Sequence, residues 1–310
     1  MEFAHKSVLL EETVDALCAG EKKLIVDGTL GGGGHTSLIL QRYPSVRVIG
    51  IDADIEAINA SKKRLCGFSE RVEFVNDNFR NIKNILNNIG TDSIDGAVLD
   101  LGVSSYHLDN AGRGFSYMHD APLDMRMNAQ SGKSAYDVVN TYTADELREI
   151  FYKYGEEKWS ARIAEFIAEY RARKAIETTF ELSDIIKSAI PAKAREKGGH
   201  PAKRIFQAIR IEVNDELAPL EQALRDFIDV ISPGGRLCVI TFHSLEDRIV
   251  KNVFKDLSSG CTCPKDFPVC VCGRVPVVKN ITKKPILPSE DEIRENSRSK
   301  SAKLRAALKL

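Results

Sequence analysis

The sequence predicts an α/β fold, in which an open and mostly parallel sheet is interrupted by a helical segment. Three observations predict it. Short apolar runs that end in polar residues alternate with helical patterns, as buried parallel strands with crossover helices require. A glycine-dense turn, Gly28–His35, follows the first of these runs. The alternation stops between residues 106 and 212 and resumes with an apolar run at Leu237–Phe242.

The first run, Leu24–Asp27, predicts a strand, and Ser37–Arg42 predicts the helix after it. Glycines at the carboxyl end of a strand let backbone N–H groups approach a ligand without obstruction by a Cβ atom. In open α/β sheets this crevice binds nucleotides. The dinucleotide fingerprint Gly-x-Gly-x-x-Gly fails, because Thr36 or Ser37 stands at its last glycine. The turn therefore favours a ligand without a pyrophosphate, such as S-adenosylmethionine, and a ligand-free glycine turn is the alternative.

The segments before and after this strand, turn and helix predict a helix on the amino-terminal side, and a strand and a second helix on the carboxyl-terminal side. Apolar residues at helical spacing predict a helix over Ser7–Leu17, with its first residue as N-cap. Val46–Asp52 predicts the second strand. A carboxylate at the position of Asp52 can accept hydrogen bonds from both hydroxyls of an adenosine ribose. Asp54 is the better candidate to cap the helix predicted over Ile55–Leu65.

Two further strands complete the first half of the sheet. Arg71–Phe79 predicts the third strand and its exit, where Phe79 could pack on an adenine face, and Ile94–Asp100 predicts the fourth. The acids that end the first, second and fourth strands should meet at one edge of a parallel sheet. Because carboxylates placed together repel one another, this edge favours a ligand that carries hydroxyls or positive charge.

The interruption predicts a helical domain over residues 106–212, inserted into a sheet domain formed by residues 1–105 and 213–310. Arg113–Met127 is loop-like. Three helices are expected, over Thr143–Tyr154 (opened by a capping box), Lys158–Lys174 and Leu182–Ala189. The absence of a strand pattern there indicates a helical insert after the fourth strand, and we expect this insert to be the substrate-recognition domain.

The last part of the chain predicts a return to the sheet. Asn214–Val230 predicts a helix that must absorb Pro219, and Ser232–Arg236 predicts a turn before the strand Leu237–Phe242. From Ser289 onward the sequence predicts a basic helical tail.

Composition is that of a globular protein, with 43% hydrophobic and 28% charged residues among 310 and a formal net charge of zero. No apolar run approaches the roughly 20 residues of a membrane span, and no signal peptide opens the chain. We therefore expect a cytoplasmic location and no membrane partner. Basic clusters at Lys193–Arg210 and Gly273–Leu310 are compatible with nucleic-acid contact, and equally with solvated helix faces.

Four of the seven cysteines lie close together in the sequence: Cys261, Cys263, Cys270 and Cys272. Four thiolates can close a tetrahedral zinc site. Their C-x-C spacing is less well attested than C-x₂-C, however, and no histidine lies nearby. The sequence alone therefore assigns no metal ligand and leaves zinc binding open.

Six blocks in order resemble a known family over nearly the full chain. They are Asp27–His35, Leu99–Ser105, Arg113–Met118, Pro122–Met127, His200–Ile211 and Thr241–Arg248. Together they are similar to the bacterial MraW family of small-subunit ribosomal RNA methyltransferases. The resemblance implies a Rossmann-like fold with a helical insert and S-adenosylmethionine-dependent methylation of the exocyclic amino nitrogen of a decoding-region cytidine in 16S ribosomal RNA. The implied partner is that RNA, within the small ribosomal subunit.

The resemblance also implies a set of cofactor contacts, which fall on Gly33, Gly34, His35, Asp52, Phe79, Asp100 and His107. Asp100 is in addition the hypothetical catalytic residue, because a carboxylate can accept from a cytosine amino group; a purely cofactor-binding role is its alternative. Asp124 and Arg126 could order a loop, and His243 and Ser244 are second candidates for substrate contact.

Two other functions compete with RNA methylation. A nicotinamide-dependent dehydrogenase is disfavoured by the broken glycine fingerprint. A non-catalytic ribosomal RNA-binding or assembly factor would keep a relic of the cofactor pocket. The sequence leaves open the oligomeric state, the proton acceptor, the form of the substrate (naked RNA or assembled subunit) and the basic residues that contact RNA.

Overall fold

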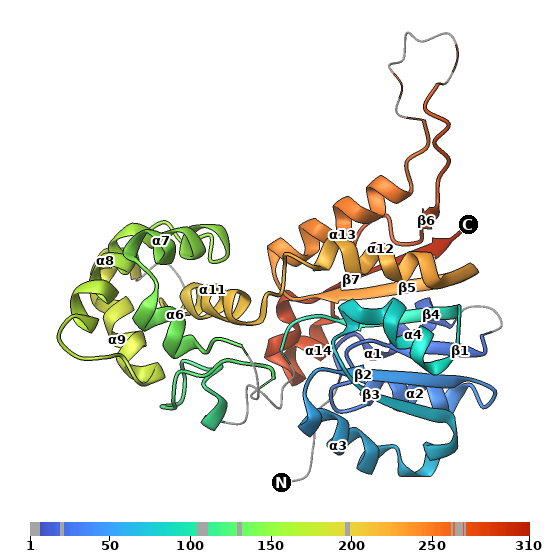
Figure 1. Ribbon diagram of the computed structural model, residues 1–310, viewed down its shortest axis with the longest axis horizontal. Coiled ribbons are helices and arrows are strands. Elements are labelled where there is room, and N and C mark those ends of the chain that lie inside the picture. The colour runs from blue at the N-terminus through green and yellow to red at the C-terminus, as the bar shows by residue number, and fades with distance from the viewer. Residues whose placement is uncertain are drawn as a thin grey trace. The chain divides into compact units, whose positions relative to one another are not determined.

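A computed structural model describes residues 7–18, 22–103, 111–128, 132–195, 199–261, 263, 269 and 271–310. The chain divides into two compact units (Figure 1). Unit 1 comprises Met1–Gly102 and Leu217–Leu310, and unit 2 comprises Val103–Glu216.

Unit 1 is built on a seven-stranded sheet of order β3-β2-β1-β4-β5-β7-β6. Its strands are β1 Leu24–Asp27, β2 Arg47–Asp52, β3 Val72–Asn76, β4 Ile94–Asp100, β5 Ile231–Thr241, β6 Val278–Asn280 and β7 Lys303–Lys309. The first five run parallel, whereas β7 is antiparallel to both β5 and β6. The predicted α/β class is confirmed, and the sheet is doubly wound like a Rossmann sheet.

Helices cover both faces of this sheet (Figure 1). One core contains Ile25 and residues of α1 Leu10–Leu17, α2 Gly34–Arg42 and α3 Ile55–Arg64. The other contains Val26 and residues of α4 Ile82–Ile89, α12 Leu220–Val230 and α13 Ser244–Leu257. Neighbours such as Ile25 and Val26 enter opposite cores because successive strand side chains point to opposite faces. Strands buried on both sides explain the continuous apolar runs.

The first helix differs from its prediction. It begins at Leu10 rather than at Ser7, and no described side chain caps it. Leu9 has φ +51°, and its N–H donates to Glu292 Oε1 at 2.8 Å. Ser7 is buried beside the glycine turn instead, since a Cβ atom on Gly34 would lie 1.9 Å from Ser7 Oγ. The partner that starts the helix is 283 residues away, so the local pattern could not reveal it.

The helix predicted over Asn214–Val230 is wrong at its start. Asp215, with φ +48°, ends the preceding helix, and Pro219 is the N-cap of α12. A proline is tolerated at the beginning of a helix, where its missing N–H has no partner to lose.

The predicted turn before β5 is also wrong, because residues 232–235 belong to the strand. Gly234 has φ +83°, and the pairing register with β4 shifts between Ile94 and Gly96. The glycine pair therefore forms an irregularity within the strand and does not precede it.

The basic tail contains only short helical segments, α14 Glu290–Glu295 and the 3₁₀ turn η4 Ser297–Ser301, and it ends in β7. Arg305 of this strand is nearly buried and pairs with Asp247 of α13 through Nε at 2.7 Å. Lys303 reaches the same carboxylate at 3.2 Å. Burial alone would raise the pKa of Asp247, but these two cations hold it below its usual range. A long-range ion pair thus lets a basic segment enter the sheet.

Over its described residues, the regular secondary structure of unit 2 is helical, apart from one isolated bridge between Pro122 and Thr178. Its helices are α6 Ala135–Thr141, α7 Ala144–Lys153, α8 Ser160–Arg171, α9 Thr179–Ala189, α10 Ala192–Arg195 and α11 Lys203–Asn214, with the 3₁₀ turn η3 Ala111–Arg113 before them. The predicted capping box at Thr143 and Glu146 is present. No helix in the described ranges has the length and apolar character needed to cross a membrane.

Candidate functional site

The strand tips of unit 1 form the candidate site. Parallel pairing sets Asp27 of β1 opposite Gly50 of β2 and Val98 of β4. The carboxyl ends of β1, β2 and β4 therefore bring Asp27, Asp52 and Asp100 to one edge of the sheet, as the sequence predicts. Together with the glycine turn, these acids define the edge where open α/β sheets bind their ligands.

The glycine turn is held to the neighbouring strands by its own backbone. The N–H of Gly28 donates to Val98 O and that of Leu30 donates to Ile51 O, both at 2.9 Å. Gly31 and Gly33 have φ +52° and +72°, conformations that favour glycine. The turn is thus anchored on both sides, and its conformation depends on glycine at two positions.

Helix α2 begins within the glycine run, three residues before its predicted start. Gly33 is its N-cap, and Gly34 and His35 form its first turn. The backbone N–H groups of a first helical turn have no partner within the helix, and they carry the positive end of its dipole. The side chain of His35 is buried. This places three of the residues predicted to contact the cofactor side by side at one helix start.

Asp52 ties the tip of β2 to this turn. Its Oδ2 accepts from the N–H of Gly31 at 2.8 Å, and its Oδ1 accepts from the N–H of Asp54 at 2.8 Å. Asp54 is the cap of α3, as predicted, and accepts from the N–H of Glu56. The Asp52 carboxylate therefore shapes the turn in addition to the ribose-binding role predicted for it.

Asp27 is buried and is satisfied by the turn itself. Thr36 Oγ1 donates to Asp27 Oδ2 at 2.7 Å, and the N–H of Thr29 donates to Oδ1 at 3.3 Å. Burial raises its pKa to about 6, against these hydrogen bonds, and the negative charge of Asp52 adds a smaller increase. Asp27 therefore links β1 to α2. The sequence located this acid at the tip but gave no signal of its partner Thr36.

Asp100 is the acid with unused hydrogen-bonding capacity. Its N–H donates to Thr29 Oγ1 at 2.6 Å, which joins β4 to the glycine turn. Its Oδ1 is buried, and no described residue donates a hydrogen bond to it. Burial raises the pKa of Asp100 well above the usual value, and the negative charges of Asp27 and Glu246 raise it further. A buried acceptor that lacks a donor is costly unless a ligand supplies one.

Phe79 and its neighbours lie beyond the tip of β3. Phe79 is half-buried at the start of the 3₁₀ turn η2 Phe79–Asn81, and its Cβ would lie 3.2 Å from a Cβ atom on Gly28. The preceding Asn78 caps this turn by accepting from the N–H of Arg80. The aromatic ring is therefore adjacent to the glycine turn. His107, the seventh predicted cofactor contact, lies outside the described residues.

His243 follows β5 and acts as the N-cap of α13. Its Nδ1 accepts from the N–H of Glu246, and Glu246 Oε2 accepts from the N–H groups of Phe242 and His243. This reciprocal capping gives His243 a structural role beside the predicted substrate contact. Buried Glu246, which the sequence analysis did not single out, adds negative charge near Asp100. Glu246 stands three residues after the N-cap His243, and this capping-box spacing is the sequence signal that could have identified it.

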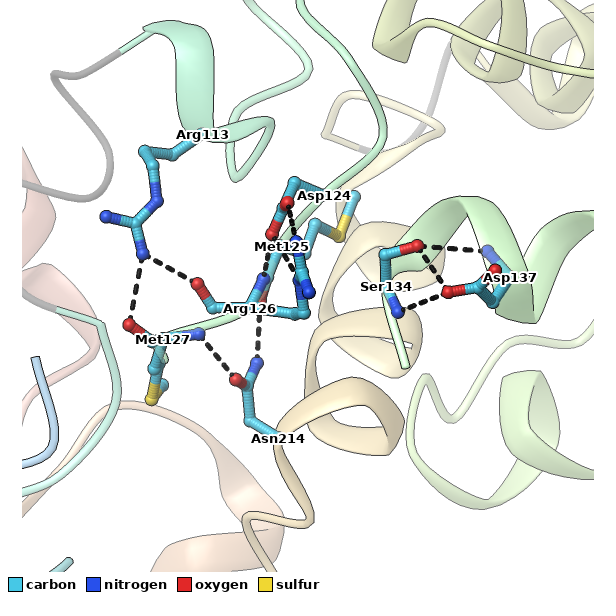
Figure 2. A network of polar contacts seen from close by, with 8 residues as sticks. All are labelled: Arg113, Asp124, Met125, Arg126, Met127, Ser134, Asp137 and Asn214. Carbon is cyan, nitrogen blue, oxygen red and sulfur yellow. Dashed lines mark hydrogen bonds and ion pairs between the residues drawn. The ribbon is translucent and has the colours of Figure 1, made fainter. Parts of the chain in front are cut away.

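In unit 2, the loop 113–127 is closed by a network of polar contacts (Figure 2). Arg113 Nη2 donates to the carbonyl oxygens of Arg126 and Met127, at 2.7 and 3.0 Å. Asp124 accepts from Arg126 through Nε at 3.1 Å and Nη2 at 2.7 Å. Burial alone would raise the pKa of Asp124, but Arg126 holds it below its usual range. Asp124 and Arg126 thus order this loop.

Asn214, at the end of α11, joins the same loop to the helical core (Figure 2). Its Nδ2 donates to Met125 O at 2.8 Å, and its Oδ1 accepts from the N–H of Met127 at 2.7 Å. Met125 is fully buried and has φ +58°. Gly114 is also required, because a Cβ atom there would lie 2.2 Å from Pro122 O. The loop has one tightly specified conformation.

Two aromatic residues of unit 2, Phe115 and Tyr117, are involved in packing. Phe115 is buried in the core of this unit. Tyr117 stacks on His200 with ring centroids 4.3 Å apart and meets Phe206 edge-on at 5.7 Å. The structure thus favours a packing role for Phe115. Lys203, in the basic cluster of the same unit, is exposed to solvent.

Comparison with known proteins identifies similar sequences over the whole length. Residues 2–310 match the model of the MraW methylase family. The chain is 56% identical over 311 residues to ribosomal RNA small subunit methyltransferase H of Clostridioides difficile (strain 630), covering all of both chains. It is 55% identical to the protein of the same name from Carboxydothermus hydrogenoformans, over 100% of this chain and 99% of that one. Among solved structures, an rRNA methylase from Streptococcus thermophilus aligns with 96% of this chain and 92% of its own at 12% identity, with a TM-score of 0.39.

Proposed function

The chain belongs to the MraW methylase family, and on that premise we propose that it methylates the exocyclic N4 amino group of a cytidine in 16S ribosomal RNA. S-adenosylmethionine is the cofactor. Relatives at 55–56% identity are named ribosomal RNA small subunit methyltransferase H, which supports the substrate class. The finer assignment to a cytidine N4 rests on the resemblance and on the chemistry of the strand tips.

The single observation that carries the proposal is the buried Oδ1 of Asp100 beside the glycine turn. It is an acceptor that no described residue satisfies. Its carboxyl group has a raised pKa. A cytosine amino group offers the donor that this oxygen lacks. The negative charges of Asp27 and Glu246 oppose ionisation of Asp100. A site that bound only a neutral ligand through its hydroxyls would not require an acid in such surroundings.

The residues present fit the cofactor. The glycine turn begins helix α2, whose first backbone N–H groups have no partner within the helix, and the acids at the strand tips favour positive charge. We assign cofactor binding to Gly33, Gly34, His35, Asp52, Phe79, Asp100 and His107. When bound, S-adenosylmethionine supplies an electrophilic methyl group on a positively charged sulfur. Asp52 would hold the ribose hydroxyls, and Phe79 would pack on the adenine.

Asp100 is the residue that we assign to the chemistry. A cytosine amino nitrogen is a poor nucleophile, because its lone pair is delocalised into the ring. A carboxylate that accepts from the amino group orients it and later accepts the proton that the nitrogen must lose. The raised pKa of Asp100 makes the carboxylate a better proton acceptor than an ordinary aspartate. Positioning and electrostatics are the main contributions that the chain needs to make.

We assign methyl transfer to residues 1–105 and 213–310, and RNA recognition to the insert over residues 106–212. Exposed Lys193, Arg195 and Lys203 lie in the basic cluster of this insert. In the tail, by contrast, Lys303 and Arg305 neutralise Asp247. We therefore expect the insert to contribute more of the salt-dependent RNA affinity than the tail. The target cytidine must also leave its stack to be methylated, at a cost of a few kcal/mol.

A direct experiment tests whether the chain methylates RNA and which atom of the base receives the methyl group. Small subunits and naked 16S RNA, both from cells that lack the enzyme, are incubated with the chain and labelled S-adenosylmethionine, and the digested nucleosides are separated by mass spectrometry. We expect N4-methylcytidine as the labelled product. The D100A variant should form none while it retains the wild-type circular dichroism spectrum.

Label in 5-methylcytidine or in another base would contradict the N4 assignment. RNA binding without any label on either substrate would favour the alternative function, a non-catalytic assembly factor. Turnover by D100A close to that of the wild type would remove Asp100 from the chemistry. Comparison of the two substrates also identifies the form that the enzyme uses.

A further inference from the structure

The cysteines between α13 and β6 form a cluster that methyl transfer does not use. The Sγ atoms of Cys261, Cys263 and Cys272 lie within 4.8 Å of one another. The fourth cysteine singled out in the sequence, Cys270, lies outside the described residues. Three thiols brought together from both arms of one loop constitute a group of soft ligands.

The spacing of the sulfur atoms suits a metal better than a disulfide. Cys261 Sγ and Cys272 Sγ are 3.7 Å apart. A disulfide requires about 2.05 Å. Two thiolates on one tetrahedral zinc, with Zn–S bonds of about 2.3 Å, lie about 3.8 Å apart. The observed separation therefore matches the zinc geometry.

The backbone around the cluster supports thiolate ligands. The N–H of Cys263 donates to Cys261 Sγ at 3.4 Å. A donor of this kind stabilises the deprotonated sulfur that binds metal. Gly273 follows Cys272 with φ +59°, which lets the chain turn immediately after that cysteine. The cluster is thus formed by local backbone geometry as well as by side chains.

The described residues of this loop are tied to the rest of the unit at its base. Its base is closed where the N–H of Val277 donates to Leu257 O at 2.8 Å and where Arg274 contacts Asp256. Beyond this base, the described residues Val269 and Val271 are 70% and 74% exposed, so these two side chains bury little apolar surface. Small segments that lack a core are usually held by disulfides or metals, so a cross-link among the described cysteines would stabilise this loop.

We propose that Cys261, Cys263 and Cys272 bind one zinc ion, which closes the loop 258–277. Zinc is favoured because tetrahedral thiolate sites suit this ion and because the described ligands include no carboxylate. The role is structural. Helix α13 has 14 residues and is about 21 Å long, and the loop begins at the end of it that is remote from the strand tips. The proposal therefore does not depend on the proposed function.

Metal analysis of the full chain tests this site. The wild type and the variants C261S, C272S and C66S are purified under reducing conditions, saturated with zinc and dialysed, and zinc is measured by mass spectrometry. Cys66 is an exposed cysteine outside the cluster, so C66S is the matched control. We expect about one zinc per chain in the wild type and in C66S, and at least tenfold less in C261S and C272S.

Two further measurements keep the result interpretable. Cobalt in place of zinc should produce thiolate-to-metal charge-transfer absorption in the wild type that C261S lacks. Chelation should expose the loop 258–277 to proteases without changing the affinity for S-adenosylhomocysteine. Equal affinity in C261S would show that the variant is folded.

Three results would overturn the proposal. One is a wild type that retains no more zinc than C261S. Another is iron bound in preference to zinc. The third is a zinc-free chain in which thiol counting finds two cluster cysteines oxidised to a disulfide under reducing purification.

Discussion

Replacement of Asp52 should weaken cofactor binding more than it weakens the fold. In D52A, the N–H of Gly31 loses its 2.8 Å acceptor and the cofactor ribose loses both of its carboxylate contacts. Hydrogen bonds to a charged group contribute about 1.5–3 kcal/mol each. Loss of two such bonds predicts a decrease of about 3 kcal/mol or more in binding free energy, an affinity loss on the order of 100-fold. D52N keeps one acceptor oxygen, so we expect about a tenfold loss.

Isothermal calorimetry with S-adenosylhomocysteine measures this effect. Asp95 provides the matched control, because its Oδ2 accepts from the N–H groups of Lys23 and Leu24 at the amino ends of the strands. D95A therefore removes comparable backbone contacts at the opposite edge of the sheet. It should lower the free energy of unfolding and leave the affinity unchanged. If D52A binds within threefold of the wild type, or if D95A loses as much affinity, the assignment of Asp52 to the ribose is refuted.

Three further predictions concern stability. Because burial raises the pKa of Asp27 from 3.8 to about 6, the folded state holds this proton more tightly than the unfolded chain does. The free energy of unfolding of the ligand-free chain should therefore fall by about 2 kcal/mol as the pH rises from 4 to 6. Urea titrations should show that the free energy of unfolding of D27N depends less on pH than that of the wild type. An equal pH dependence in the two proteins would contradict the assignment of this effect to Asp27. In G114A, a residue with φ +68° would carry a Cβ atom 2.2 Å from Pro122 O. In the control G132A, the residue has φ +85° but its Cβ atom would have no neighbouring atom within 4 Å. G114A should thus destabilise by at least about 2 kcal/mol more than G132A, and equal melting temperatures would count against the closed loop 113–127. N214A leaves the N–H of Met127 without its acceptor and should cost about 2–3 kcal/mol in thermal unfolding; a change below 0.5 kcal/mol would show that this link is dispensable.

The strand tips could be predicted because their signals are local. Each parallel strand is an apolar run closed by a polar residue, and β4 has the predicted bounds Ile94–Asp100. The caps Asp54 and Thr143 were also correct, since a cap is defined by residues two or three positions apart. The glycine turn is also a local signal, and it predicted that the ligand binds at the carboxyl ends of the strands.

What the sequence could not show depends on contacts between distant residues. The sequence predicts a basic helical tail, yet Arg305 enters the sheet because Asp247 neutralises it from 58 positions away. The pKa of Asp100 is raised by burial and, further, by the charges of Asp27 and Glu246, which only the sheet topology brings near. The orphaned oxygen of Asp100 and the sulfur–sulfur distances of the cysteine cluster are likewise properties of the folded chain.

The most direct test of the central claim is a crystal structure of the chain with S-adenosylhomocysteine. The account predicts the adenosine against the glycine turn, with both ribose hydroxyls within hydrogen-bond distance of Asp52 and the sulfur on the side of Asp100. A nucleoside bound elsewhere, or a ribose that contacts neither oxygen of Asp52, would contradict it.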